Sequence, residues 1–156
     1  MNKIFFALLA TILLTTGCQK YRLKQDDKTI QDYLSQKGIT NAVKTSSGLY
    51  YVVDAPGGTE KPLYTSLITL HYEGRLTSDS IFDSSYRRGF TSNFSPNQVV
   101  TGFGEGIQLF GRGGKGTLFI PSGLAYGNQA KPSAGKNLVK IPKNSVLIFK
   151  VDIIDF

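Results

Sequence analysis

Residues 66–85 read SLITLHYEGRLTSDSIFDSS and contain the two clearest structural signals in the chain. The first part, Ser66–Leu76, opens with an apolar run that favours a buried central β-strand. Tyr72 lies within this predicted strand, where successive side chains point to opposite faces of the sheet. The second signal is the pair Phe82-Asp83, in which an acid directly follows an aromatic residue. We therefore expect a central strand at Ser66–Leu76 and regard Asp83 as a candidate site residue.

Other apolar stretches predict strands at Leu49–Val53, Gly116–Ile120 and Val146–Ile154. A short helix is predicted over 103–110, where apolar residues recur at i, i+4 and i+7. An economical way to combine these elements is an α+β domain over 47–156. Its strongly twisted antiparallel β-sheet wraps around one short α-helix.

Residues 1–17 resemble a bacterial secretion signal. A short basic start precedes the apolar run Ile4–Leu14, which is too short to cross a bilayer as a helix. Cys18, the only cysteine, stands at the expected cleavage point, so we expect it to be lipidated. Thr15 holds a place where lipoprotein signals usually have Leu, and an ordinary signal peptide with an incidental cysteine is the alternative. Gln19 after the cysteine points to a lipid-anchored protein of the cell envelope, on the outer membrane and facing the periplasm.

Residues 18–46 are predicted to form the tether that follows the anchor. Apolar residues at i, i+3 and i+4 favour a short N-terminal helix over Lys28–Lys37. Asp26 and Asp27 are candidate N-caps of this helix, and Gly38 is a candidate stop. We expect the helix to be a spacer that packs loosely on the domain, or a surface for a partner.

The chain is basic, with a formal charge of +7 and a pI near 9.5. A basic balance can indicate nucleic-acid binding. An exported protein does not meet nucleic acid, so we exclude that partner. Lysines gather in the loop 128–140 and just after it, at Lys131, Lys136, Lys140 and Lys143. They are more simply a solvated surface, although a binding site for a partner is the other interpretation.

Two sequence features that could suggest a ligand-binding or catalytic site do not form one. The segment Gly111–Gly116 matches G-x-G-x-x-G, but it follows a predicted helix and opens a strand, the reverse of a dinucleotide site. It is better interpreted as a turn. His71 is the sole histidine, so neither a zinc site nor a hydrolytic triad can be assembled around it. We expect a structural histidine, no metal and no cofactor.

A set of aromatic residues in the second half of the chain is the most specific signal. Each one alone is more often a core residue than a site residue. In this order, and with Asp83 and the segment Leu124–Gly127 beside them, they resemble the pocket motifs of the FKBP-type peptidyl-prolyl cis-trans isomerases. They are Tyr72, Phe82, Phe103, Tyr126 and Phe149.

The resemblance implies a role for each matching residue. Asp83, Tyr126 and Phe149 would be the catalytic residues. Tyr126 would donate its hydroxyl to a substrate carbonyl, and Arg88 would help to hold Asp83. Phe103 would be the floor of a proline pocket, where the family most often has Trp. The residues that bind substrate would be Tyr72, Phe82, Arg88, Val99, Val100, Phe103 and Ile141.

The resemblance also implies the activity and the partners. The substrates would be proline-containing polypeptides, here envelope or secreted proteins that are folding. Macrolide inhibitors would compete for the same pocket. A non-catalytic proline-binding or chaperone module, tethered to the membrane, is the alternative function.

Overall fold

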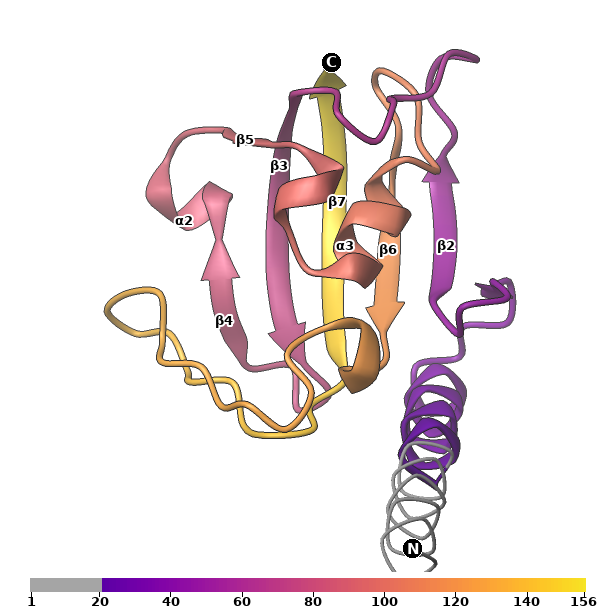
Figure 1. Cartoon of the computed structure of the whole chain (residues 1–156), viewed down its shortest axis with the longest axis vertical. Helices are drawn as coiled ribbons and strands as arrows, with labels where there is room; N and C mark the ends of the chain where they lie inside the picture. Colours follow the sequence, from indigo (N-terminus) through magenta and orange to yellow (C-terminus); the bar gives the residue numbers. More distant parts are fainter. Residues whose placement is uncertain (1–20) are drawn as a thin grey trace, which may run out of the picture.

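The computed structural model describes residues 21–156, in which a seven-stranded antiparallel sheet is the main element. The strand order is β1-β2-β6-β7-β3-β4, and β5 pairs with β3 (Figure 1). The central strands β3 and β7 pair over most of their length, with Tyr72 opposite Val151. The bounds are β1 Val43–Lys44, β2 Tyr50–Ala55, β3 Ile68–Leu76, β4 Ile81–Ser84, β5 Ser92–Phe94, β6 Lys115–Ile120 and β7 Leu147–Asp155.

The predicted central helix is α3, Thr101–Ile107, which lies across one face of the sheet (Figure 1). It is rich in glycine because it lies very close to its neighbours. A Cβ on Gly102 would come within 2.4 Å of Ile120, and one on Gly106 within 2.3 Å of Leu118. The helix is shorter than predicted, since Phe110 lies beyond its end. The Phe110 side chain is nevertheless fully buried, so the periodic spacing identified a core residue correctly.

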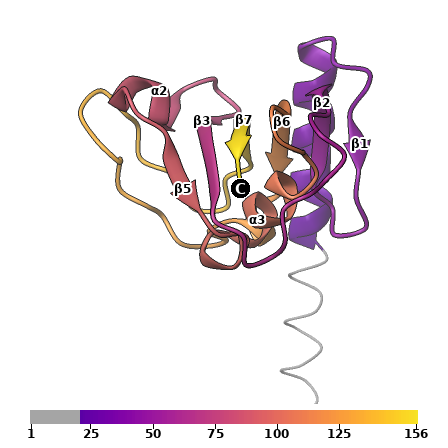
Figure 2. The same ribbon diagram turned by 90° about the horizontal axis from the view of Figure 1, so that it is seen from above.

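An N-terminal helix covers 21–36 of the described residues and lies beside β2 (Figure 2). Its side chains Ile30 and Leu34 are buried against Tyr50, Phe119 and other residues of the sheet face opposite α3. The prediction of a loosely packed spacer over Lys28–Lys37 was therefore wrong. The apolar residues whose spacing predicted the helix form the face by which the helix packs against the sheet.

The sequence suggested that two aspartates, Asp26 and Asp27, cap this helix, and that prediction was wrong. Asp26 and Asp27 lie within the helix, and each uses its carboxylate to hold another part of the domain. Asp26 is buried, with its side chain bonded to Ser122. Asp27 accepts from the Tyr50 hydroxyl at 2.7 Å and pairs with Lys44. The hydrogen bond from Lys44 lowers the pKa of Asp27.

The remaining secondary-structure predictions are largely confirmed. The long apolar strands and the left-handed stop at Gly38, with φ of 66°, are found as expected. Residues 111–114 form the turn between α3 and β6, and Lys115 and Gly116 begin β6. His71 lies on the sheet face opposite α3. Its ring stacks there on that of Tyr86, with the centroids 4.6 Å apart. The sequence did not predict β1, β4, β5 or the one-turn helix α2, Ser85–Arg88, which are all short.

The edge strands β1, β4 and β5 are each short or partly covered, and β5 has only three residues. Strand β1 has only two residues, and strand β4 receives a backbone hydrogen bond of 3.0 Å from Val139 N–H to the Ile81 carbonyl. Within 21–156 no helix is both long and apolar enough to cross a membrane. The predicted signal peptide 1–17 and Cys18 lie outside the described residues.

Candidate active site

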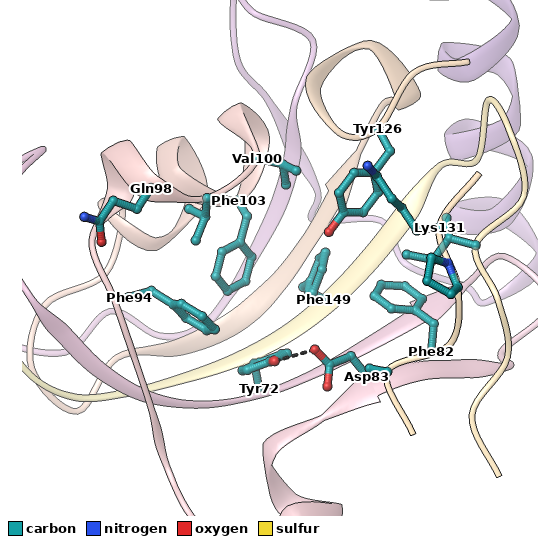
Figure 3. Close-up of a pocket in the computed structure, with 14 residues that line it drawn as sticks. Tyr72, Phe82, Asp83, Phe94, Gln98, Val100, Phe103, Tyr126, Lys131 and Phe149 are labelled. Carbon is teal, nitrogen blue, oxygen red and sulfur yellow. Dashed lines mark hydrogen bonds between the residues drawn. The ribbon is translucent and has the colours of Figure 1, made fainter. Parts of the chain in front are cut away.

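A cavity of about 560 Å³ opens on the face of the sheet that carries α3 (Figure 3). Its walls come from strands β3, β4, β5 and β7, from α3 and the turn before it, and from the segment after β6. Most of the lining is aromatic or aliphatic. The lining residues are Tyr72, Phe82, Asp83, Phe94, Gln98, Val99, Val100, Phe103, Tyr126, Lys131, Pro132, Ala134, Ile141 and Phe149.

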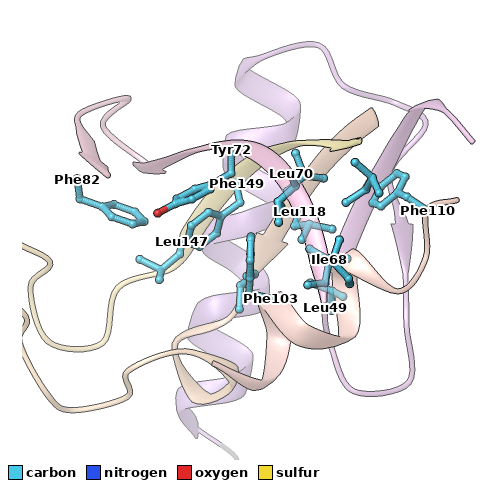
Figure 4. Close-up of a cluster of buried hydrophobic side chains, with 14 of the residues drawn as sticks. Leu49, Ile68, Leu70, Tyr72, Phe82, Phe103, Phe110, Leu118, Leu147 and Phe149 are labelled. Atoms are coloured by element: carbon cyan, nitrogen blue, oxygen red, sulfur yellow. The ribbon is translucent and has the colours of Figure 1, made fainter. Parts of the chain in front are cut away.

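Tilted and edge-to-face contacts join the aromatic rings of the wall, and Tyr72, Phe82, Phe103 and Phe149 are among the buried side chains in Figure 4. The Phe103 and Phe149 ring centroids are 4.7 Å apart, and Phe149 meets Phe82 edge-on at 5.4 Å. Phe94 contacts both Tyr72 and Phe103, at 5.5 and 5.9 Å. Tyr72, Phe94, Phe103 and Phe149 each contact two or more other aromatic rings, and such contacts favour a preformed wall.

Gly74 makes room for two of these rings. It lies in β3 directly between Asp83 of β4 and Phe149 of β7. A Cβ at this position would come within 2.5 Å of the Phe82 ring and 2.9 Å of the Phe149 ring. Only a residue without a side chain lets both rings lie over the strand at this point.

Asp83 is the only carboxylate in the wall, and it is held from two sides. The Tyr72 hydroxyl donates to Asp83 Oδ2 at 2.5 Å, and Arg88 Nη1 donates to Oδ1. Arg88 Nη2 also donates to the Tyr72 hydroxyl oxygen at 3.0 Å. Burial, with the hydrogen bond to Asp83 second, raises the pKa of Tyr72 to about 12. Tyr72 therefore stays protonated at neutral pH and keeps Asp83 in place.

The two serines after Asp83 explain how β4 and α2 are positioned. Ser84 caps α2, since its hydroxyl accepts from the Arg87 N–H at 3.3 Å. Ser85 is fully buried, and its hydroxyl accepts from the Tyr72 N–H at 2.8 Å. The sequence motif Phe82–Ser85 thus joins β3 to the helix that carries Arg88.

Tyr126 faces this group from the opposite wall, with its hydroxyl directed into the cavity (Figure 3). It follows the turn Ser122–Leu124, where the Ser122 carbonyl accepts from the Gly127 N–H at 2.8 Å. Burial, followed by the charge of Asp83, raises the pKa of Tyr126. The hydroxyl is therefore a proton donor for a ligand rather than an anion.

The structure brings together almost all of the site residues predicted from the sequence. Arg88 does not line the cavity and instead lies behind Asp83 and Tyr72. Phe94 was missed, although an aromatic residue shortly before Val99 could have drawn attention to it. Gln98, Lys131, Pro132 and Ala134 were also missed, because their place in the wall depends on loop conformation. In 21–156 no cluster of three or more His, Cys, Asp or Glu side chains could hold a metal ion.

The chain is similar to proteins of known family. Residues 58–154 match the family model for FKBP-type peptidyl-prolyl cis-trans isomerases. The chain is 40% identical over 131 residues to "FKBP-type peptidyl-prolyl cis-trans isomerase FkpA" of Aeromonas hydrophila, covering 83% of this chain and 46% of that protein. It is 36% identical over 126 residues to the protein of that name in Escherichia coli K12, covering 80% and 44%. The chain thus spans about half the length of the curated relatives it matches.

Solved structures resemble the domain as well. The crystal structure of FkpA from Escherichia coli aligns with a TM-score of 0.70 and 28% identity, over 98% of this chain and 71% of that one. The crystal structure of AtFKBP13 aligns with a TM-score of 0.63 and 32% identity, over 74% of this chain and 98% of that one. With the family model matching most of the domain, this chain belongs to the FKBP-type peptidyl-prolyl cis-trans isomerase family.

Proposed function

We propose that this protein is a peptidyl-prolyl cis-trans isomerase that acts on Xaa–Pro bonds of folding polypeptides. One observation supports this most directly. The cavity is an aromatic hollow whose only carboxylate, Asp83, faces a tyrosine hydroxyl on the opposite wall (Figure 3). Such a site has an apolar place for a pyrrolidine ring and polar groups for the amides on either side of it.

The chemistry needs little more than this environment. Isomerisation of an Xaa–Pro bond is slow because amide resonance sets a barrier of roughly 18–20 kcal/mol. Twisting the bond breaks the resonance and leaves an amide that is less polar than the planar form. An apolar cavity therefore favours the twisted transition state over the planar substrate, which is the condition for catalysis. A thousandfold acceleration requires only about 4 kcal/mol of such differential binding.

Each wall would have a distinct part in this reaction. Phe103 and Phe149 would contact the proline ring. The Tyr126 hydroxyl would hold one substrate carbonyl while the other carbonyl rotates. Asp83, kept in place by Tyr72 and Arg88, would face the rotating amide. The backbone at Val100 lies at the rim, where the bound peptide would pass.

The cellular setting is part of the proposal. A signal peptide at 1–17 and lipidation at Cys18 would place the domain in the cell envelope. We propose the outer membrane, with the domain facing the periplasm. The clients would then be envelope or secreted proteins, and macrolides would be inhibitors of the same cavity. Metabolic labelling with a radioactive fatty acid, compared between wild type and Cys18→Ala, tests the anchor directly.

An assay of prolyl exchange tests the activity. The purified chain should speed cis/trans exchange of an Ala-Leu-Pro-Phe peptide, followed by NMR exchange spectroscopy. Asp83→Asn should lower kcat/KM by about 10- to 100-fold, since it removes a charge-assisted hydrogen bond. A macrolide should inhibit the wild type. No acceleration by micromolar wild-type protein would refute the proposal.

The alternative is a binding module that captures prolyl segments without a catalytic role. The observation that favours it is the long loop 128–140, which adds Lys131, Pro132 and Ala134 to the wall. If isomerase-dead variants such as Asp83→Asn still supported the cellular role, binding alone would be sufficient. Loss of client capture after deletion of the loop, with isomerase activity retained, would also favour this alternative.

A further inference from the structure

The loop 128–140 is a fixed wall of the cavity. Lys131 and Ile141 exchange two backbone hydrogen bonds of 2.9 Å, which close the loop at its base. Farther along, Val139 bonds to the backbone of β4, as described above. The Arg87 side chain donates to the Asn137 carbonyl at 3.3 Å and joins the loop to α2. The side chains of this loop therefore keep a defined position relative to the site.

Positive charge dominates this side of the entrance. Residues 128–145 include four lysines and no acid, and α2 contributes Arg87 and Arg88 beside them. None of the ion pairs within 21–156 involves a lysine of this segment. The only carboxylate that lines the cavity, Asp83, already pairs with Arg88. The lysines of 128–145 thus present positive charge that is not paired with a carboxylate of the described residues.

Of the four lysines in residues 128–145, Lys131 is the one that lines the cavity. Its ammonium lies 5.1 Å from the centroid of the Tyr126 ring (Figure 3). Its only side-chain hydrogen bond in the described residues goes to Gln129 Oε1 at 3.1 Å. If Tyr126 binds a backbone carbonyl next to the proline, a side chain close to that carbonyl passes within reach of this ammonium.

We propose that the site prefers prolyl segments with an acidic side chain next to the proline, and that Lys131 determines this preference. The inference rests on the proposed function and names its substrate class. Because the ammonium is partly exposed, the gain is modest and is screened by salt. We expect about a two- to fivefold advantage in kcat/KM for Glu over Gln, since about fivefold is the upper end of what an exposed charge pair contributes.

The experiment uses the full chain in a neutral detergent at low ionic strength. Peptides based on Ala-Ala-Leu-Pro-Phe-Ala carry Glu, Gln or Lys in turn at each position within two residues of the proline. Prolyl exchange is measured by NMR, which needs no coupling protease. The readout is the ratio of kcat/KM for Glu and Gln peptides in the same protein, so a general loss of activity cancels.

The expected ratio is about two to five at one or more positions, with Lys peptides the slowest. In Lys131→Gln the ratio should fall to about one. The control Lys61→Gln makes the same change of net charge on an exposed lysine outside the cavity wall, and it should keep the ratio. Raising the salt to about 0.5 M should lower the wild-type ratio, since such interactions are then largely screened.

Two results would overturn the inference. One is equal kcat/KM for Glu and Gln peptides at every position in the wild type. The other is a Glu preference that survives unchanged in Lys131→Gln. The unmodified Leu-Pro peptide separates this inference from the proposed function. If that peptide is not accelerated, the isomerase proposal fails, whereas acceleration without an acidic preference removes only the role of Lys131.

Discussion

Asp26 and Ser122 lie 96 positions apart in the sequence and are joined by two buried hydrogen bonds. One carboxylate oxygen of Asp26 accepts from the Ser122 N–H at 2.9 Å and from its hydroxyl at 2.6 Å. The pair fastens the N-terminal helix to the turn that precedes Tyr126. It therefore connects the helix on one face of the sheet with the cavity on the other.

Removing this carboxylate should destabilise the domain. Asp26→Ala leaves two buried donors of Ser122 without an acceptor, which costs about 1–3 kcal/mol in the free energy of unfolding. Urea denaturation measures the change. Asp32→Ala is the matched control, because Asp32 is an exposed aspartate of the same helix whose only ion pair is with Lys28. Equal stability of the two variants would contradict the structural role of Asp26.

The Tyr126 hydroxyl should matter for catalysis but not for folding. Tyr126→Phe keeps the ring and removes the hydroxyl, so kcat/KM should fall about three- to tenfold, which is the effect of one net hydrogen bond. The melting temperature should stay close to that of the wild type. Tyr64→Phe, which changes an exposed tyrosine, should alter neither quantity. Unchanged kcat/KM in Tyr126→Phe would remove the hydroxyl from the mechanism.

Alkaline pH should destabilise the protein through Tyr72. Its pKa rises from an ordinary value of 10.0 to about 12 in the folded state, first through burial and then through the bond to Asp83. Below pH 10 both states keep the proton and the stabilising contribution is complete. As the pH rises from 10 to about 12, the unfolded state loses the proton first, so stability falls.

Urea denaturation at several pH values measures this decline. Tyr33 also has a pKa raised to about 12, by burial and by its bond to Asp79, and contributes to the same decline. Tyr72→Phe should make stability fall less steeply with pH and leave the part due to the other tyrosines with raised pKa values, which are Tyr33, Tyr86 and Tyr126. A slope identical to that of the wild type would show that Tyr72 titrates normally in the folded protein.

The space at Gly74 should be needed for the aromatic walls. Gly74→Ala places a Cβ against Phe82 and Phe149, so both rings must move toward the cavity. Overpacking of this kind costs about 1–3 kcal/mol of stability. We expect a lower kcat/KM together with the lower stability. In Gly58→Ala the new Cβ meets no atom closer than 3.8 Å, so this control should be close to wild type.

The sequence predicted most of the fold and most of the cavity. The apolar strands and the aromatic set could be recognised because the pattern of buried and exposed residues is visible within short segments of the sequence. Asp26 was misinterpreted as a cap because its partner Ser122 is far away in sequence. Phe94 and Lys131 were missed because β5 and the loop 128–140 have no periodic pattern of their own. Their positions depend on pairing with β3 and with Ile141.

The short or partly covered edge strands have a consequence for a protein that would meet unfolded chains. An exposed, unpaired strand edge is a template on which another extended chain can add and aggregate. Here β1 and β5 are too short to offer such a template, and Val139 occupies part of the edge of β4. A partly folded client would therefore bind in the aromatic cavity more readily than pair with an edge of the sheet. It would dissociate without having nucleated an aggregate that contains both proteins.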